Sequence, residues 1–247
     1  MFLFKKSQKQ ETPTREKSDE NFKIVLFSLD GVLINSIDDI VDAVNETLRY
    51  FSFPTVAAEK IRPFIGNGTK ALILRAISES TRVSARVFSI NDLNEVLDFY
   101  KQYYNDHAVN KTILYDGVPE TLETLYSLNT YMGCLSNKPA EMTERILESF
   151  DLSLFFDSIV CPEHIICAKP DKESVHLSIK QISEIRKTKI FPMQTILVGD
   201  SAIDIEAARN AGCASCGFLG GYGDRKMLFE QNPRWTINNI TQLLPLV

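Results

Sequence analysis

Four short polar segments carry side chains that could act together on a ligand. Three of them directly follow apolar runs: Ser28-Leu29-Asp30-Gly31, Ser136-Asn137-Lys138-Pro139 and Gly199-Asp200-Ser201-Ala202-Ile203-Asp204. The fourth, Ala168-Lys169-Pro170-Asp171, sets a lysine before a proline, which restricts the backbone of that lysine to extended conformations. Together the segments offer carboxylates, hydroxyls, an amide and two lysines, a set of groups that can bind a charged ligand.

The position of these segments after apolar runs predicts that they meet. The carboxyl ends of parallel strands lie along one edge of a sheet, and open α/β folds bind their ligands there. Asp30-Gly31 alone could be an ordinary turn between a strand and a helix, because Asp-Gly is common in turns. That explanation does not account for distant segments that end in the same manner, so we expect one shared pocket at the sheet edge.

Short apolar runs alternate with longer amphipathic stretches from residue 23 onward, which is typical of a parallel sheet covered by helices. Buried strands are predicted over 24–27, 131–135, 158–161 and 195–198, with a further strand that ends near Phe218. Helical spacing of apolar residues follows Pro119 and Pro139. We therefore predict an α/β fold with a doubly wound, Rossmann-like parallel sheet.

The stretch from about residue 38 to 112 interrupts this alternation with helical periods. Ser36 and Asp39 are placed to cap the first of its helices. Tyr104 falls on the apolar side of another, where packing is the expected role. We predict an inserted all-helical cap over 38–112, within a core made of 23–37 and 113–247.

Composition and charge narrow the class of partner. The chain has 27 Lys and Arg against 32 Asp and Glu, a formal charge of -5, so no overall basic field exists to hold a nucleic acid or an anionic membrane. No apolar run reaches the roughly 18 residues of a spanning helix. The five cysteines favour buried thiols in a reducing compartment over a disulfide framework. We expect a cytoplasmic monomer or homodimer without nucleic-acid or membrane partners, preceded by a disordered, charge-rich tail over 1–22.

From residue 23 to its end, the chain resembles the haloacid dehalogenase superfamily of phosphohydrolases. Its four motifs occur in the family order, and the Gly66-Asn67-Gly68 turn and the SNKP, AKPD and VGDSAID segments are most similar to the phosphoglycolate phosphatase branch. The helical insert is similar to the family's cap, which closes over the active edge of the sheet. The resemblance implies hydrolysis of a phosphate monoester of a small metabolite, with Mg²⁺ as cofactor.

The resemblance also implies roles for the carboxylates. Asp30 matches the residue that donates a proton to the leaving alcohol and later activates the attacking water. Asp200 matches the carboxylate that binds Mg²⁺, and Asp204 supports it. Asp30 would be a further ligand. Mg²⁺ prefers oxygen ligands and keeps several waters, so this inventory suits the ion.

The substrate-binding residues are implied in the same way. Ser136 and Asn137 match the second motif, whose hydroxyl and backbone amides hold phosphate oxygens, and Gly31 follows Asp30 in the first motif. Lys169 matches the cation that stabilises negative charge on the nucleophile and on the transferring phosphoryl group. The nature of the leaving alcohol is left open, because the loops of a cap set that choice.

Two cations beside the Gly66-Asn67-Gly68 turn have a possible role in that choice. Arg62 and Lys70 flank the turn, and one of them could reach a substrate carboxylate when the cap closes. A solvated surface charge is the simpler interpretation of both.

The family's nucleophilic Asp falls at position 28, where this chain has Ser28. The change removes the nucleophile, one carboxylate ligand of Mg²⁺ and the phosphoaspartate intermediate. A carboxylate with a pKa of about 3.9 is a good leaving group and a serine alkoxide is a poor one, so a phosphoserine would tend to stall. The three histidines show no spacing that would supply Ser28 with a base.

Three hypotheses follow from Ser28. In the first, the activity is severely weakened or lost and the protein binds a phosphorylated ligand or a protein partner. In the second, the protein is a working phosphomonoesterase in which a water associated with Mg²⁺ attacks directly. In the third, an active enzyme has had its nucleophile replaced, or the sequence carries an error. The function we expect is phosphomonoester hydrolysis of the phosphoglycolate phosphatase type, with turnover limited by Ser28.

Overall fold

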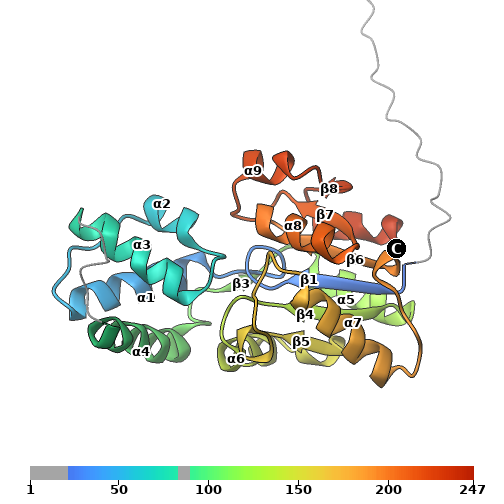
Figure 1. Cartoon of the computed structure of the whole chain (residues 1–247), viewed down its shortest axis with the longest axis horizontal. Coiled ribbons are helices and arrows are strands. Elements are labelled where there is room, and N and C mark those ends of the chain that lie inside the picture. Colours follow the sequence, from blue (N-terminus) through green and yellow to red (C-terminus); the bar gives the residue numbers. More distant parts are fainter. Residues whose placement is uncertain (1–21, 83–89) are drawn as a thin grey trace, which may run out of the picture.

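The computed structural model of the chain describes residues 22–82 and 90–247, and its centre is a parallel sheet (Figure 1). Six strands lie in the order β5-β4-β1-β6-β7-β8. Their bounds are Ile24–Ser28 (β1), Tyr131–Leu135 (β4), Ser158–Val160 (β5), Thr195–Gly199 (β6), Ala214–Phe218 (β7) and Trp235–Ile237 (β8). The predicted doubly wound α/β fold is confirmed, and β8 is an addition that the sequence pattern did not indicate.

Strand β1 lies where the order of strands reverses. The chain builds β4 and β5 on one side of β1, and then returns to build β6, β7 and β8 on the other side. Such a reversal opens a crevice at the carboxyl ends of the strands, where open α/β folds bind their ligands. The last residue of β1, Ser28, is therefore at the expected centre of a binding site.

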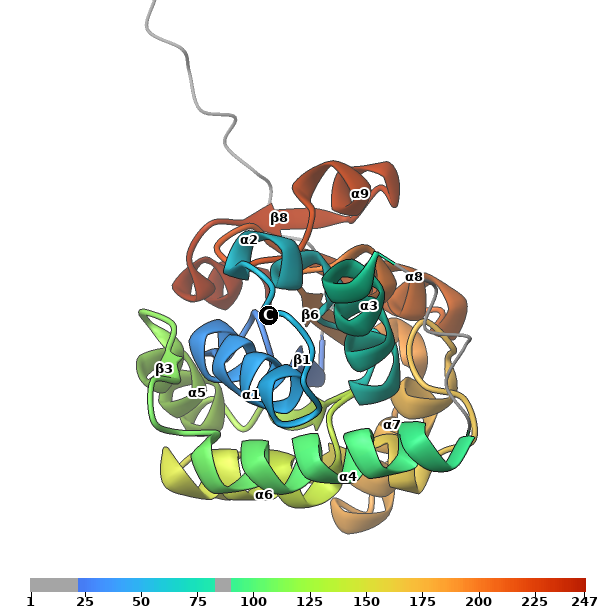
Figure 2. The same ribbon diagram turned by 90° about the vertical axis from the view of Figure 1, so that its left-hand side faces the viewer.

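Helices cover both faces of the sheet (Figure 2). They are α5 (Val118–Ser127), α6 (Ala140–Ser149), α7 (Glu173–Ile185), α8 (Ala202–Ala211) and the short α9 (Arg225–Glu230). Single-turn or longer 3-10 helices occupy Arg62–Phe64, Ser153–Phe155, Pro162–His164, Pro192–Gln194 and Ile240–Leu246. Ile24 and Leu26 pack against α7 and α8, while Val25 and Phe27 join the cluster that contains α5 and α6. Strand β1 is apolar up to its last residue, Ser28, because both of its faces are buried.

Four helices form a separate unit beyond the carboxyl ends of the strands (Figure 1). This helical unit consists of α1 (Ile37–Tyr50), α2 (Ala58–Ile61), α3 (Thr69–Thr81) and α4 (Ile90–His107). The chain enters it through β2 (Ile34–Asn35) and leaves it through β3 (Ile113–Leu114), and these two strands pair antiparallel. Both connections to the sheet domain therefore run side by side.

The capping role predicted for Ser36 and Asp39 is wrong. Ser36 precedes α1 but makes no side-chain hydrogen bond to the helix, because its hydroxyl donates to Asp30 instead. Both Asp39 oxygens accept backbone N–H groups of Lys111 and Thr112, at 2.8 to 3.0 Å. Partners distant in the sequence thus outcompete the local cap, and Asp39 fastens the chain that returns from the helical unit.

Phe22, which the sequence places in the predicted tail, packs against the sheet domain. Phe22 is buried, and its ring contacts Trp235 of β8 edge to face at 5.8 Å. The rest of the predicted tail, residues 1–21, lies outside the described residues. Among the helices of the described part, none is long and apolar enough to cross a membrane.

Candidate active site

A cavity of about 60 Å³ lies between the carboxyl edge of the sheet and the helical unit. Its polar lining comes from every segment singled out in the sequence: Ser28, Asp30, Ser136, Asn137, Lys138, Lys169, Ser201 and Asp204. Its apolar lining comes largely from the helical unit: Ile40, Ile65, Leu72, Tyr100, Tyr104, Met142 and Ile203. The predicted convergence of distant segments is therefore present, and the space left suits a small ligand.

Lys169 sits at the floor of this cavity with all three of its donors engaged. Its Nζ donates to Ser28 Oγ at 3.0 Å, to the Leu135 carbonyl at 3.1 Å and to Asp204 Oδ1 at 2.8 Å. Both members of the ion pair with Asp204 are buried. Burial excludes water from the pair, so the ammonium is held rigidly beside the hydroxyl of Ser28.

Asp204 has its two oxygens committed to different partners. Oδ1 accepts from Lys169, and Oδ2 accepts from the Ser201 hydroxyl at 2.5 Å and from the Ser201 backbone N–H at 3.3 Å. The Asp204 carboxylate is part of the capping box in the first turn of α8, and it also holds the ammonium of Lys169. This geometry suits the supporting position predicted for Asp204 more than direct contact with a ligand.

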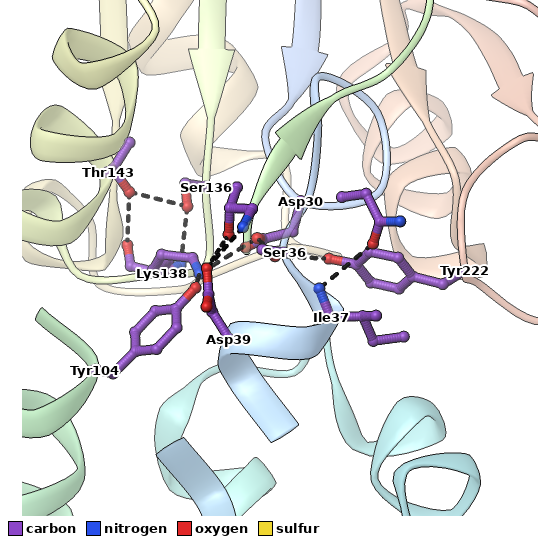
Figure 3. Close-up of polar contacts among 11 residues, drawn as sticks. Asp30, Ser36, Ile37, Asp39, Tyr104, Ser136, Lys138, Thr143 and Tyr222 are labelled. Carbon is purple, nitrogen blue, oxygen red and sulfur yellow. Dashed lines mark hydrogen bonds and ion pairs between the residues drawn. The ribbon is translucent and has the colours of Figure 1, made fainter. Parts of the chain in front are cut away.

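Asp30 also lines the cavity and is held by Ser36 and Lys138 (Figure 3). Its Oδ1 accepts a 2.5 Å hydrogen bond from Ser36 Oγ and lies 3.2 Å from Lys138 Nζ. Ser36 in turn contacts the hydroxyl of the half-buried Tyr222 at 3.3 Å. Ser36 and Lys138 therefore orient the Asp30 carboxylate, which is part of the cavity lining.

Ser136 and Asn137, in the second polar segment, have different partners. Ser136 Oγ accepts from the backbone N–H of Lys138 at 3.0 Å and from the hydroxyl of Thr143 at 3.1 Å. Asn137 Nδ2 donates to the carbonyl of Gly66, at 2.9 Å, in the turn of the helical unit. Asn137 is therefore a contact between the sheet domain and the helical unit as well as a cavity residue.

Asp200 is buried and is not among the residues that line the cavity, although its neighbour Ser201 is. Its Oδ2 accepts the backbone N–H groups of Tyr222 and Gly223 at 3.1 and 2.9 Å. A Cβ at position 31 would fall 2.1 Å from that oxygen, and Gly31 has a φ of +77°. The site thus needs glycine after Asp30, both for its backbone conformation and to admit the Asp200 carboxylate.

Burial, and after it the charge of Asp204, raises the pKa of Asp200 from 3.8 to about 7. The charged form of this carboxylate is therefore poorly compensated by the protein alone. Within the described ranges 22–82 and 90–247, no three His, Cys, Asp or Glu residues are grouped to hold a metal. The Asp200 carboxylate lies against Gly31, the residue that follows Asp30.

The raised pKa of Asp200 predicts that, without bound metal, the stability of the fold depends on pH. Between about pH 4 and 7 the folded protein keeps a proton that the unfolded chain loses, so stability falls as pH rises through this window. Asp200→Asn should remove this contribution and raise the free energy of unfolding at pH 8 by on the order of 4 kcal/mol. Urea unfolding in a chelator at pH 5 and pH 8 measures the difference.

Asp98→Asn, at an exposed carboxylate on α4, is the matched control for Asp200→Asn and should leave the pH dependence unchanged. Mg²⁺ should then stabilise the natural chain at pH 8 more than it stabilises Asp200→Asn. An identical pH dependence in Asp200→Asn and the natural chain would contradict the assigned environment of Asp200.

Lys138, Tyr104 and Ser36 are site residues whose roles were not predicted from the sequence. Lys138 was part of a recognised segment but had no role, and Tyr104 was assigned to packing. In the structure Lys138 Nζ donates to Tyr104 Oη at 2.5 Å and lies 4.3 Å from the centre of its ring. Arg62 and Lys70, by contrast, are exposed and are not among the residues that line the cavity.

The fold and this arrangement of motifs define a class of protein. The chain belongs to the haloacid dehalogenase-like hydrolase family, whose sequence profile matches residues 25–218. The matched region contains the whole cavity lining and both connections to the helical unit.

Particular relatives within the family are similar over nearly the whole chain. The chain is 31% identical over 226 residues to phosphoglycolate phosphatase of Haemophilus influenzae (strain 86-028NP), covering 92% of this chain and 98% of the relative. It is 31% identical over 235 residues to phosphoglycolate phosphatase of Vibrio parahaemolyticus, with 93% and 98% covered. The crystal structure of a predicted phosphoglycolate phosphatase from Haemophilus somnus 129pt superimposes with a TM-score of 0.82, at 26% identity and coverage of 92% and 98%.

Proposed function

We propose that the chain is a Mg²⁺-dependent phosphomonoesterase of the phosphoglycolate phosphatase type, and that Ser28 makes it slow. The strongest support is the meeting of groups from four distant segments in one small cavity at the reversal of the sheet. The names of its relatives agree with this assignment. The cavity size and the apolar lining favour a small phosphorylated metabolite over a polymer.

Different residues of the site act on the phosphoryl group and on the leaving alcohol of a phosphate ester. Ser136 and the backbone N–H of Asn137 bind phosphoryl oxygens, and Lys169 places a positive charge next to position 28. Fixed donors and charges of this kind stabilise a transferring phosphoryl group without reorganisation. In direct attack by water, Asp30, oriented by Ser36, takes a proton from the water and passes that proton to the leaving alcohol.

The carboxylates of Asp30 and Asp200 are a donor set that fits Mg²⁺. Mg²⁺ is commonly held by one or two carboxylates together with waters and substrate phosphates, so two carboxylates suffice. The raised pKa of Asp200 indicates a buried carboxylate that a cation would compensate. When bound, the ion supplies charge neutralisation at the phosphoryl group. Asp204 keeps its place as the anchor of Lys169 in this proposal.

Ser28 removes the covalent route but leaves the binding groups intact. Its hydroxyl accepts from Lys169 Nζ, which is a donor and cannot take the proton of Ser28 while it is charged. No histidine is among the residues that line the cavity. Hydrolysis in this chain therefore depends on direct attack by water that Asp30 activates.

Binding and turnover together test the proposal. With Mg²⁺, the natural chain should bind inorganic phosphate and phosphoglycolate, and a chelator should weaken both, as measured by calorimetry. Phosphate release from phosphoglycolate should be detectable and about 10³-fold or more below ordinary enzyme rates. Release at an ordinary rate would show that Ser28 is not limiting. Binding with no release would identify a degenerate family member that retains its ligand, and absence of binding would refute the proposal.

The same proposal covers partners and location. A small phosphorylated metabolite is the expected ligand, and the formal charge of -5 gives no support to a nucleic-acid partner. All five cysteines are free thiols, which suits the reducing cytoplasm. Phosphate release measured in a cytoplasmic extract, before and after depletion of this protein, would test the location of its activity.

A further inference from the structure

Two lysines, Lys138 and Lys169, line the cavity in the described part of the chain, and they differ in the number of N–H donors available to a ligand. An ammonium has three donors. Lys169 donates all three, to Ser28, to the Leu135 carbonyl and to Asp204. Lys169 is therefore a fixed charge at the phosphoryl end of the cavity, with no donor to offer a second group of the substrate.

Lys138 is the cation with unused capacity (Figure 3). It is only 8% exposed, it donates to Tyr104 Oη at 2.5 Å, and its Nζ lies 3.2 Å from Asp30 Oδ1. These two contacts leave one N–H of the ammonium for a ligand. A buried ammonium is costly unless it is paired, and Asp30, the carboxylate beside it, also accepts from Ser36. An anion entering the cavity would complete its pairing.

The position of Lys138 beside Asp30 identifies which part of a substrate it meets. This step rests on the proposed function, in which Asp30 protonates the ester oxygen of the leaving alcohol. In a phosphorylated 2-hydroxy acid, the carboxylate is one carbon from that ester oxygen, and standard bond lengths place its nearer oxygen about 3 Å away. A group that contacts Asp30 and a group that contacts Lys138 can thus belong to one small molecule, because the two side chains are themselves 3.2 Å apart.

We propose that Lys138 binds the carboxylate of the leaving group, so that the site selects phosphorylated 2-hydroxy acids over phosphate monoesters that lack a carboxylate. Tyr104 of α4 acts as a positioning residue, because its hydroxyl and ring hold the ammonium from the side of the helical unit. Arg62 and Lys70, the other cations considered for this role, are exposed and lie outside the cavity lining. Recognition of the carboxylate is complete only when α4 is in place.

Paired ligands separate this role from a general effect on the site. Phosphoglycolate and ethyl phosphate have the same skeleton, and only the first carries a carboxylate. Calorimetry with Mg²⁺ on the natural chain should give an affinity about tenfold or more higher for phosphoglycolate, as expected for one hydrogen bond between charged groups. Lys138→Met and Lys138→Gln should bring the ratio of the two affinities close to one. Lys70→Met, at the exposed lysine beside the turn, should leave the ratio unchanged.

The outcomes distinguish the inference from the proposed function. If both ligands bind the natural chain equally, or if Lys138→Met weakens both by the same factor, Lys138 only orients Asp30 and the inference is wrong. If inorganic phosphate and both esters fail to bind, the proposed function is wrong and the inference falls with it. Thermal melting of both variants shows that they are folded, and Tyr104→Phe should lower the affinity ratio while keeping part of it.

Discussion

Replacing Ser28 by aspartate is expected to raise the phosphatase turnover of this chain by about 10³-fold or more. The new carboxylate would attack phosphorus and later leave as a weak base, which serine does poorly. The rest of the site is arranged to receive it, because Lys169 Nζ is already 3.0 Å from the side-chain oxygen at position 28. Release of inorganic phosphate from phosphoglycolate with Mg²⁺ measures the gain.

Ser28→Asn is the matched control, since asparagine has the shape of aspartate without its charge or nucleophilicity. Ser28→Asn should remain as slow as the natural chain. Equal rates for Ser28→Asp and the natural chain would mean that the remaining motifs no longer support catalysis. Binding of phosphoglycolate to all three proteins, measured alongside, would separate lost chemistry from a lost site.

Replacing Lys169 by methionine is expected to lower the free energy of unfolding by about 3 to 5 kcal/mol. The side chains of Lys169 and Asp204 are 3% and 2% exposed, with Nζ and Oδ1 at 2.8 Å. Removal of the ammonium would leave Asp204 as a buried, unpaired carboxylate, and its charge already opposes ionisation of Asp200. Urea unfolding at neutral pH, compared with the natural chain, measures the loss.

Lys180→Met, at an exposed lysine of α7, is the control for loss of a lysine and should change stability little. The double variant Lys169→Met with Asp204→Leu should recover much of the loss, because it removes the unpaired charge as well. A small loss in Lys169→Met alone would indicate that water reaches Asp204, contrary to the burial described. Phosphate binding should be lost in both variants that lack Lys169.

The strands of the sheet could be predicted because most of them are buried on both faces and so are apolar throughout. The runs 24–27, 131–135 and 195–198 match β1, β4 and β6 within one residue. β8 escaped prediction because it has three residues with an exposed Thr236 at its centre, too short to show a pattern. The antiparallel pair β2 and β3 has two residues in each strand and is likewise invisible in the sequence.

The site was predictable where its residues follow strands and unpredictable where its contacts cross between domains. Ser136, Asn137 and Lys169 were identified because the segments that contain them are distinctive. The role of Lys138 depends on Tyr104, which lies 34 residues away and on another unit. Ser36 and Asp39 have the spacing of a local cap, and only the folded chain shows that tertiary partners claim both side chains.

The paired strands β2 and β3 determine what happens to the site when the helical unit moves. A swing of α1 to α4 must turn about this pair, since both connections run through it. Contacts far from the pivot, Tyr104 with Lys138 and Gly66 with Asn137, would separate first. Ser36 sits next to the pivot and would stay with Asp30. Product would then leave between the helical unit and the sheet domain, while Ser36 keeps Asp30 in position for the next substrate.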